Sequence, residues 1–216
     1  MSRIARGLLV RLLRAVDLES AHALWERSPL REDGWFRSAR ERVPVDAEGR
    51  PLPWIAYPAL AFLAPRVGAA WRVFEFGCGF GTLWWGARVR EVVSCEHEAA
   101  WRDRVAGLAP ANVTIRHVPL EYGGAYSRAA AEHGGPFDLV IVDGRDRVNC
   151  AIRSVPALSP GGILLWDNSD RENYAPGLDE LRSLGFRRVD FEGIAPVEPI
   201  RTRTSLLYRD GNVLGL

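Results

Sequence analysis

A glycine-rich loop between an apolar strand and a helix is the sequence feature that most constrains the fold. Residues 73–76 are apolar or strand-forming and lead directly into Gly77-Cys78-Gly79-Phe80-Gly81, after which residues 82–89 have a helical pattern. Glycines let a backbone turn sharply and approach a ligand, and the N-terminus of a following helix offers free N–H groups. The unit predicts a nucleotide-like ligand, although a plain glycine turn has the same short pattern.

Apolar runs alternate with helical stretches on both sides of this unit. Helices fit between the early runs, which indicates a parallel α/β sheet, but the last two runs have no room for a helix between them. We therefore predict a Rossmann-like α/β fold: a seven-stranded, mostly parallel sheet with helices on both faces and a final antiparallel hairpin. The expected strands are residues 72–76, 92–95, 113–118, 137–142, 162–166, 186–191 and 205–208.

The first 50 residues differ from the rest of the chain. They read as helices followed by a segment rich in proline and glycine, so we predict an N-terminal helical extension and linker over residues 1–50 and the main domain over 51–216. Residues 4–16 would form a basic amphipathic helix, which could make weak contact with a membrane surface or pack on its own domain. The sequence has no run of about 18 apolar residues, so we predict no transmembrane segment, and we recognise no cleavable leader.

Charge and cysteine content narrow the partners and the compartment. The 28 basic residues are all arginine and nearly balance the 27 acidic residues, so no broad positive field favours nucleic acid. The three cysteines are widely spaced and lack the close spacing of a disulfide framework or a zinc site, which fits a reducing, cytoplasmic location. Since the chain has no lysine, a catalytic base must be Asp, Glu, His or Tyr.

Two glutamates frame the glycine loop. Glu75 precedes Gly77 by two residues, and Glu96 ends the next expected strand, where a carboxylate can accept both ribose hydroxyls of an adenosine. Together with the loop, these residues resemble the first two motifs of class I S-adenosylmethionine-dependent methyltransferases. The resemblance implies that Gly77, Gly79 and Gly81 wrap the methionine half of S-adenosylmethionine, that Glu75 lies near its amino group, and that Glu96 binds its ribose.

Three more residues are candidate cofactor contacts. Thr82 begins the helix after the glycine loop, and His97 follows Glu96, where it could flank the adenine or remain a polar surface group. Tyr57 belongs to the segment that leads into the first strand and is a candidate for the wall of the pocket.

Polar residues follow two neighbouring central strands. Asp143 comes directly after residues 137–142, and Asp167 and Asn168 come after residues 162–166. Because ligands bind at the carboxyl ends of parallel strands, these three side chains could converge beside the cofactor, where their oxygens would suit Mg²⁺. The pattern resembles metal-dependent O-methyltransferases of the catechol, caffeoyl-coenzyme A and macrolide-sugar types. Capping of a loop or helix is the alternative role for the same side chains.

The sequence departs from the catechol-type pattern at the catalytic base. Those enzymes have a lysine shortly after the first metal-binding aspartate, but here the segment is Gly144-Arg145-Asp146-Arg147. The proton acceptor would then be Asp146, Asp143 or a metal-bound species. The chain also resembles an uncharacterised bacterial group of methyltransferases, through Trp54-Ile55-Ala56-Tyr57-Pro58 and Asp167-Asn168-Ser169-Asp170-Arg171.

These features predict a methyltransferase that uses S-adenosylmethionine, with Mg²⁺ as a possible second cofactor, to methylate a hydroxyl of a small molecule or glycan. Arg145, Arg147 and Arg171 could recognise an anionic acceptor or make surface ion pairs. One alternative is a spermidine-synthase-like aminopropyltransferase, although two arginines after the fourth strand suit a cationic polyamine poorly. Another is a non-catalytic adenosine-ligand-binding or scaffold domain in a glycan-assembly complex. The identity of the acceptor and the oligomeric state stay open.

Overall fold

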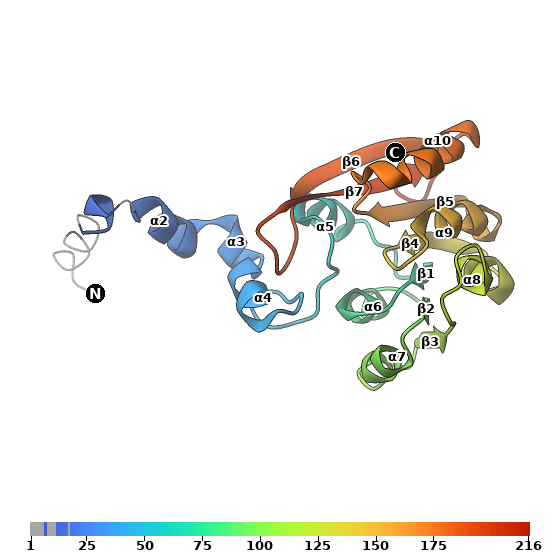
Figure 1. Cartoon of the computed structure of the whole chain (residues 1–216), viewed down its shortest axis with the longest axis horizontal. Coiled ribbons are helices and arrows are strands. Elements are labelled where there is room, and N and C mark those ends of the chain that lie inside the picture. The colour runs from blue at the N-terminus through green and yellow to red at the C-terminus, as the bar shows by residue number, and fades with distance from the viewer. Residues whose placement is uncertain (1–6, 8–11, 17) are drawn as a thin grey trace.

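A single seven-stranded sheet organises the main body of the protein in the computed structural model, which describes residues 7, 12–16 and 18–216 (Figure 1). The strand order is β3-β2-β1-β4-β5-β7-β6, and β7 runs antiparallel to both of its neighbours while the other pairs are parallel. The predicted fold class is therefore confirmed. The strands are β1 Arg72–Phe76, β2 Glu91–Glu96, β3 Val113–His117, β4 Phe137–Val142, β5 Leu158–Asp167, β6 Arg187–Ile194 and β7 Arg201–Tyr208.

Helices cover both faces of the sheet because the central strands are apolar on both sides. Phe74, Val140 and Trp166 point to the face covered by α8, α9 and α10. Val73 and Ile141, which alternate with them along the strands, point to the face covered by α5 and α6. These helices and α7, which packs beside β3, are α5 Tyr57–Leu63, α6 Phe80–Gly86, α7 Ala99–Ala106, α8 Ala125–His133, α9 Arg147–Ser154 and α10 Ala175–Ser183.

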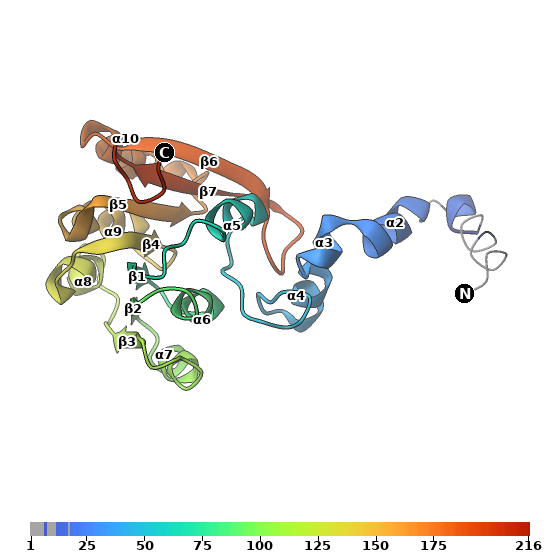
Figure 2. The same ribbon diagram turned by 180° about the vertical axis from the view of Figure 1, so that it is seen from behind.

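The N-terminal helices α2 Glu19–Arg27, α3 Pro29–Glu32 and α4 Trp35–Glu41 extend away from the sheet (Figures 1 and 2). Helix α2 has no buried residue, whereas α4 is tied to its own linker by a 2.6 Å hydrogen bond from Ser38 Oγ to the carbonyl of Val45. The predicted membrane-surface helix over residues 4–16 lies largely outside the described residues. Within the described part of the chain, no helix is long and apolar enough to cross a bilayer.

Candidate functional site

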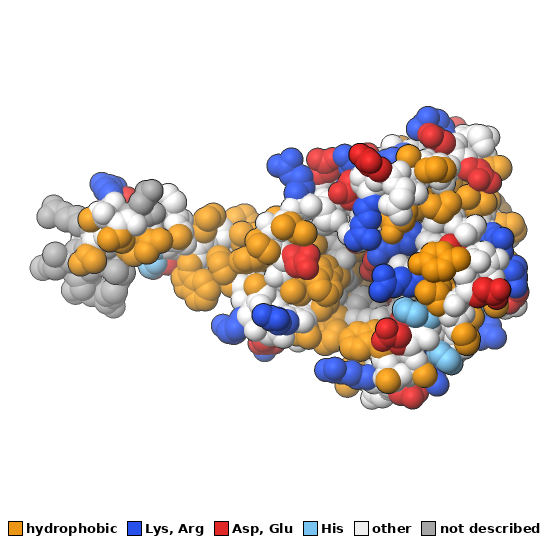
Figure 3. All heavy atoms as spheres, in the orientation of Figure 1, with side chains coloured by type: hydrophobic (Ala, Val, Ile, Leu, Met, Phe, Trp, Pro, Cys, Tyr) orange, Lys and Arg blue, Asp and Glu red, His pale blue; other side chains and the backbone are white. Residues whose placement is uncertain are grey.

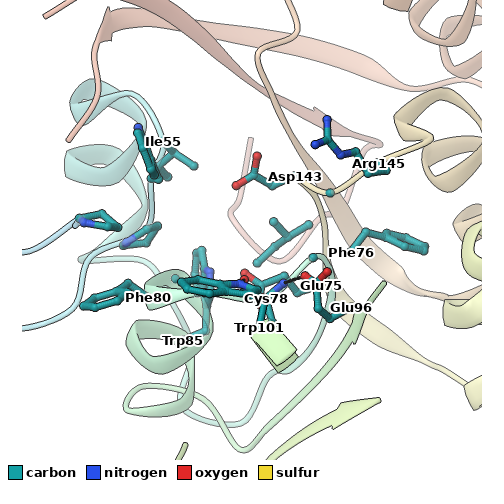
Figure 4. Close-up of a pocket in the computed structure, with 18 of the residues that line it drawn as sticks. Ile55, Glu75, Phe76, Cys78, Phe80, Trp85, Glu96, Trp101, Asp143 and Arg145 are labelled. Atoms are coloured by element: carbon teal, nitrogen blue, oxygen red, sulfur yellow. Dashed lines mark hydrogen bonds between the residues drawn. The ribbon is translucent and has the colours of Figure 1, made fainter. Parts of the chain in front are cut away.

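A cavity of about 540 Å³ opens at the carboxyl ends of β1, β2 and β4 (Figure 4). Its size lies in the usual range for pockets that hold small-molecule ligands. The glycine loop between β1 and α6 forms one wall, and parts of the linker between α4 and α5 form another. The predicted contacts that line this cavity are Glu75, Gly77, Gly79, Gly81, Glu96, His97 and Asp143.

The glycine loop needs glycine at two positions for different reasons. Gly77 has a φ of 88°, a conformation that side chains rarely adopt, and a Cβ there would lie 3.2 Å from Gly144 Cα. Gly79 lines the cavity, and a Cβ there would meet no protein atom within 4 Å. A side chain at Gly79 would therefore occupy the space of a ligand, as expected for a loop that cradles one.

The Glu96 carboxylate is held in place by backbone N–H groups. Its Oε2 accepts a hydrogen bond from Cys78 N at 3.1 Å, and its Oε1 accepts bonds from His97 N at 2.7 Å and Glu98 N at 2.9 Å. An ionised carboxylate offers about four acceptor positions, so capacity remains for a ligand hydroxyl. The side chain is thus oriented in advance at the wall of the cavity.

Glu75 is buried and binds protein groups through only one of its two oxygens. Oε2 accepts hydrogen bonds from Thr82 Oγ1 and, at 2.9 Å, from Ser94 Oγ, whereas Oε1 accepts none from the described residues. Burial raises the pKa of Glu75 to about 8. A cationic group of a ligand would favour the ionised form and bind the free oxygen.

Thr82 lies behind this glutamate instead of at the cavity surface. It is fully buried, and its hydroxyl also accepts a 2.9 Å hydrogen bond from Gly79 N. The structure therefore places Thr82 as a support for Glu75 and the loop, and not in contact with the cavity.

The predicted magnesium ligands surround an arginine. Arg147 Nη2 donates to Asp143 Oδ1 at 2.9 Å, and its Nη1 donates to Asn168 Oδ1 at 3.2 Å and to the backbone carbonyl of Asp167. The Asp167 carboxylate instead accepts a 2.6 Å hydrogen bond from Thr204 Oγ1 and is buried. Two of the three predicted ligands, Asp143 and Asn168, thus already bind a guanidinium, so this geometry does not support the predicted metal site. Among the described residues, no group of three or more His, Cys, Asp or Glu side chains could hold a metal ion.

Asp143 is the predicted catalytic residue that lies in the cavity. Its side chain is 34% exposed, and Arg147 is its ion-pair partner. Although the side chain is partly exposed, the surrounding protein desolvates its carboxylate and raises the pKa of Asp143, and the positive charges of Arg147 and Arg171 oppose that rise. Its Oδ2 atom accepts no hydrogen bond from the part of the chain that the structure describes, so it can accept a proton from a group in the cavity.

Asp146 and Tyr57 lie outside the cavity. Asp146 has a φ of 50° at the start of α9, and its carboxylate accepts bonds from Gly123 N and Asn149 Nδ2, both at 2.7 Å. Tyr57 is buried, and burial together with the nearby charge of Asp33 raises its pKa. Asp146 thus fixes the loop before α8, and Tyr57 lies close to the N-terminal extension.

Several residues that line the cavity were not predicted from the sequence. Trp101, on α7, donates a 2.7 Å hydrogen bond from Nε1 to the carbonyl of Cys78, which brings its ring against the glycine loop. Phe80 at the start of α6 and Arg42 at the end of α4 also line the cavity. An aromatic residue soon after the acidic strand end was the available signal for Trp101, but nothing local marked Arg42.

A smaller cavity of about 170 Å³ lies beside the first one, beyond the ends of β5 and β7. Trp54 lines both cavities. The remaining lining of the smaller cavity includes Asn168, Arg171, Arg201 and Thr202. The site thus consists of a large cavity at the glycine loop and a small polar one next to the predicted metal ligands.

No family model matches this sequence, and no curated protein matches it. Solved structures match at the level of the fold. A precorrin-8w decarboxylase from Methanobacterium thermoautotrophicum is 20% identical over 71% of this chain and 88% of its own, with a TM-score of 0.54. A precorrin-6y C5,15-methyltransferase from Geobacter metallireducens is 11% identical over 71% and 87%, with a TM-score of 0.53. A protein from Klebsiella pneumoniae that is provisionally named an O-methyltransferase is 18% identical over 91% and 97%, with a TM-score of 0.54.

Proposed function

We propose that this chain, which has the fold of class I S-adenosylmethionine-dependent methyltransferases, transfers a methyl group from S-adenosylmethionine to a hydroxyl oxygen of a small molecule or sugar. The observation that carries the proposal is the pair of buried glutamates on either side of the glycine loop. Glu96 is fixed by three backbone N–H groups, and Glu75 has one oxygen free. Both line a cavity of suitable size.

The residues around the glycine loop match the chemical groups of S-adenosylmethionine. When bound, this cofactor supplies a methyl group that is already activated on a sulfonium. Glu75 Oε1 would bind the ammonium group, and the Glu96 carboxylate would accept hydrogen bonds from the ribose hydroxyls. The aromatic rings of Trp101 and Phe80 offer flat apolar surfaces for the adenine.

Asp143 is the proposed general base. Its carboxylate lies in the cavity, with one oxygen held by Arg147 and the other free to accept the proton of an acceptor hydroxyl. A raised pKa makes this carboxylate a stronger proton acceptor than an ordinary aspartate. Asp146, the alternative base in the sequence, has both carboxylate oxygens bonded to protein groups and lies outside the cavity.

Arg147 supplies positive charge where the sequence predicted magnesium. Its guanidinium contacts Asp143, Asn168 and the backbone of Asp167. We therefore propose that Arg147, rather than a metal ion, orients the base. Turnover would then be the same in the presence of Mg²⁺ and of a chelator.

Calorimetry with S-adenosylmethionine tests the proposal first, on the full chain with and without Mg²⁺. We expect one site per chain and an affinity that Mg²⁺ does not change. A mass-spectrometric screen for the gain of one methyl group across metabolite and sugar acceptors then tests the reaction. Absence of cofactor binding would contradict the whole proposal, whereas turnover that a chelator abolishes would contradict only the role of Arg147.

A further inference from the structure

Exposed arginines line the two cavities at the ends of the central strands. Arg145 lines the large cavity, and Arg171 and Arg201 line the small one. No carboxylate of the described residues lies within ion-pair distance of these three side chains, whereas Arg147 is paired with Asp143. Figure 3 shows basic side chains bordering the hollow on this face of the molecule. Their charge is available to a ligand.

Asn168 holds two of the guanidinium groups side by side. Its Oδ1 accepts a 3.2 Å hydrogen bond from Arg147 Nη1 and a 3.0 Å bond from Arg171 Nη2, while its Nδ2 donates to Thr202 Oγ1 at 3.0 Å. A neutral amide does not offset the repulsion between two cations, and of these two only Arg147 has a carboxylate of the described residues within ion-pair distance. An anionic group of a ligand beside Arg171 would offset that repulsion.

The size and charge of the small cavity limit what it can hold. At about 170 Å³ it is too small for a whole ligand, but it shares Trp54 with the lining of the large cavity, so it suits one group of a larger molecule. Asp167, Asp170 and Glu198 also line it, together with Arg171 and Arg201. These carboxylates would repel any anion, so the cavity suits no polyanion such as nucleic acid, and a single anionic group fits only beside the guanidinium groups.

We propose that the methyl acceptor carries a carboxylate or phosphate close to the hydroxyl that is methylated, and that Arg145 and Arg171 bind this anionic group. Arginine forms paired hydrogen bonds with both kinds of anion. The acceptor would then lie with its hydroxyl at Asp143 and its anionic group toward the small cavity. This inference rests on the proposed function and names the class of its substrate.

Calorimetry on the full chain loaded with S-adenosylhomocysteine tests the inference. The probes are glucuronate, glucose 6-phosphate, inorganic phosphate and the neutral methyl glucoside. We expect at least one anionic sugar to bind about tenfold more tightly than the glucoside, which corresponds to about 1.4 kcal/mol. Preference for glucuronate would identify a carboxylate, and preference for the sugar phosphate or inorganic phosphate would identify a phosphate. Equal binding of charged and neutral probes would overturn the inference.

Variants locate the effect. Arg145→Gln alone and the double variant Arg145→Gln/Arg171→Gln should weaken binding of the anionic probe, the double variant by about tenfold, because each loses a charged donor. Arg182→Gln, an exposed arginine on α10, is the matched control and should bind like the parent. Unchanged affinity for S-adenosylhomocysteine shows that each variant is folded.

The two proposals fail in different ways. Loss of S-adenosylhomocysteine binding by the parent chain would contradict the proposed function. Normal S-adenosylhomocysteine binding, with anion binding that the arginine variants leave unchanged, would contradict only the assignment of Arg145 and Arg171.

Discussion

The two halves of the candidate site differ in charge. At the ends of β1 and β2, the buried carboxylates of Glu75 and Glu96 face the glycine loop, and no arginine pairs with either of them among the described residues. At the ends of β4 and β5, Asp143 is paired with Arg147, burial raises the pKa of Asp167 to about 7, and Arg145 and Arg171 lie nearby without a carboxylate partner among the described residues. Figure 4 shows Asp143 and Arg145 on one side of the cavity and the two glutamates on the other.

This difference in charge suggests how the site can bind two ligands in a fixed relative orientation. The whole chain carries a net charge of only +1, so the separation of charge is local and comes from where the strands end. S-adenosylmethionine is cationic at its sulfonium and ammonium groups, which suits the acidic half. An anionic acceptor suits the basic half, and Asp143 lies where the two would meet. Five predictions test one half or the other.

The largest effect is expected at the boundary between the halves. Asp143→Asn removes the proposed base and should lower kcat by about a thousandfold, within the range that general base catalysis contributes. Affinity for S-adenosylmethionine should stay nearly unchanged, because the acidic half is intact. The measurements are methyl transfer to an acceptor found in the screen and calorimetry, with the exposed Asp179→Asn as control. Full activity of Asp143→Asn would show that another residue is the base.

Loss of Arg147 should destabilise the basic half of the site, at the ends of β4 and β5. Its side chain is only 9% exposed and contacts Asp143, Asn168 and the backbone of Asp167. Arg147→Ala leaves these acceptors without their donor, and we expect the free energy of unfolding to fall by about 3 kcal/mol, as for other broken buried pairs. Urea denaturation measures this, with Arg182→Ala as the exposed control. Recovery of the lost stability by Mg²⁺ would indicate that the cluster is a metal site after all.

Glu96→Ala should break the acidic half. It removes the proposed ribose acceptor and leaves three backbone N–H groups without partners, so S-adenosylmethionine should bind about 100-fold more weakly, on the scale of two hydrogen bonds to a charged group. Calorimetry measures the affinity, and the exposed Glu132→Ala on α8 is the control. An anionic probe should still bind to the basic half of the variant. If Glu96→Ala binds the cofactor normally, the ribose lies elsewhere.

The smallest expected effect is a pH dependence in the acidic half. The pKa of Glu75 is about 8 in the free protein, so the carboxyl group is mostly protonated at pH 6 and must lose its proton when a cationic ligand binds. Affinity for S-adenosylmethionine should therefore rise between about pH 6 and 7.5, by at most tenfold per pH unit, before the amino group of the ligand itself titrates. Glu75→Gln should remove this rise. A rise that persists in Glu75→Gln would assign it to another group.

The same raised pKa affects the stability of the free protein. Glu75 holds its proton more tightly in the folded chain than in the unfolded chain, where the ordinary pKa is 4.5. Stability is thus greatest at low pH for this group and falls as pH rises from about 4.5 through 8. Thermal denaturation of Glu75→Gln should show a weaker loss of stability over this interval than the parent.

Strands with clear local boundaries were predicted closely, and strands defined by pairing were not. The bounds of β1 and β4 agree with the prediction, because apolar runs there end at glycine or aspartate. Strand β5 starts four residues earlier than predicted, at Leu158, which pairs with Phe137 across the sheet. Likewise, β7 begins at Arg201 because it pairs with β6 along eight residues. Pairing with a distant strand leaves no local signal in such polar segments.

The sequence predicted where the residues of the candidate site lie along the sheet better than it predicted which side chains contact one another. The sequence placed Asp143, Asp167 and Asn168 at neighbouring strand ends, and the strand order brings them to one edge of the sheet. It did not indicate that Arg147, at the start of α9, turns back among them. The direction of that side chain depends on how α9 packs against the sheet, which no short pattern encodes.

The sequence by itself determined the α/β fold and the acidic residues that frame the glycine loop, because hydrophobic periodicity and glycine turns act over a few neighbouring residues. The tertiary structure alone decided which side chains meet. In the folded chain, Arg147 lies among the predicted metal ligands. Thr82 and Asp146 lie outside the cavity, whereas Trp101 and Arg42 line it. The physical reason is that distances between remote segments are set by packing of the whole core, and a side chain binds whichever partner that packing brings within reach.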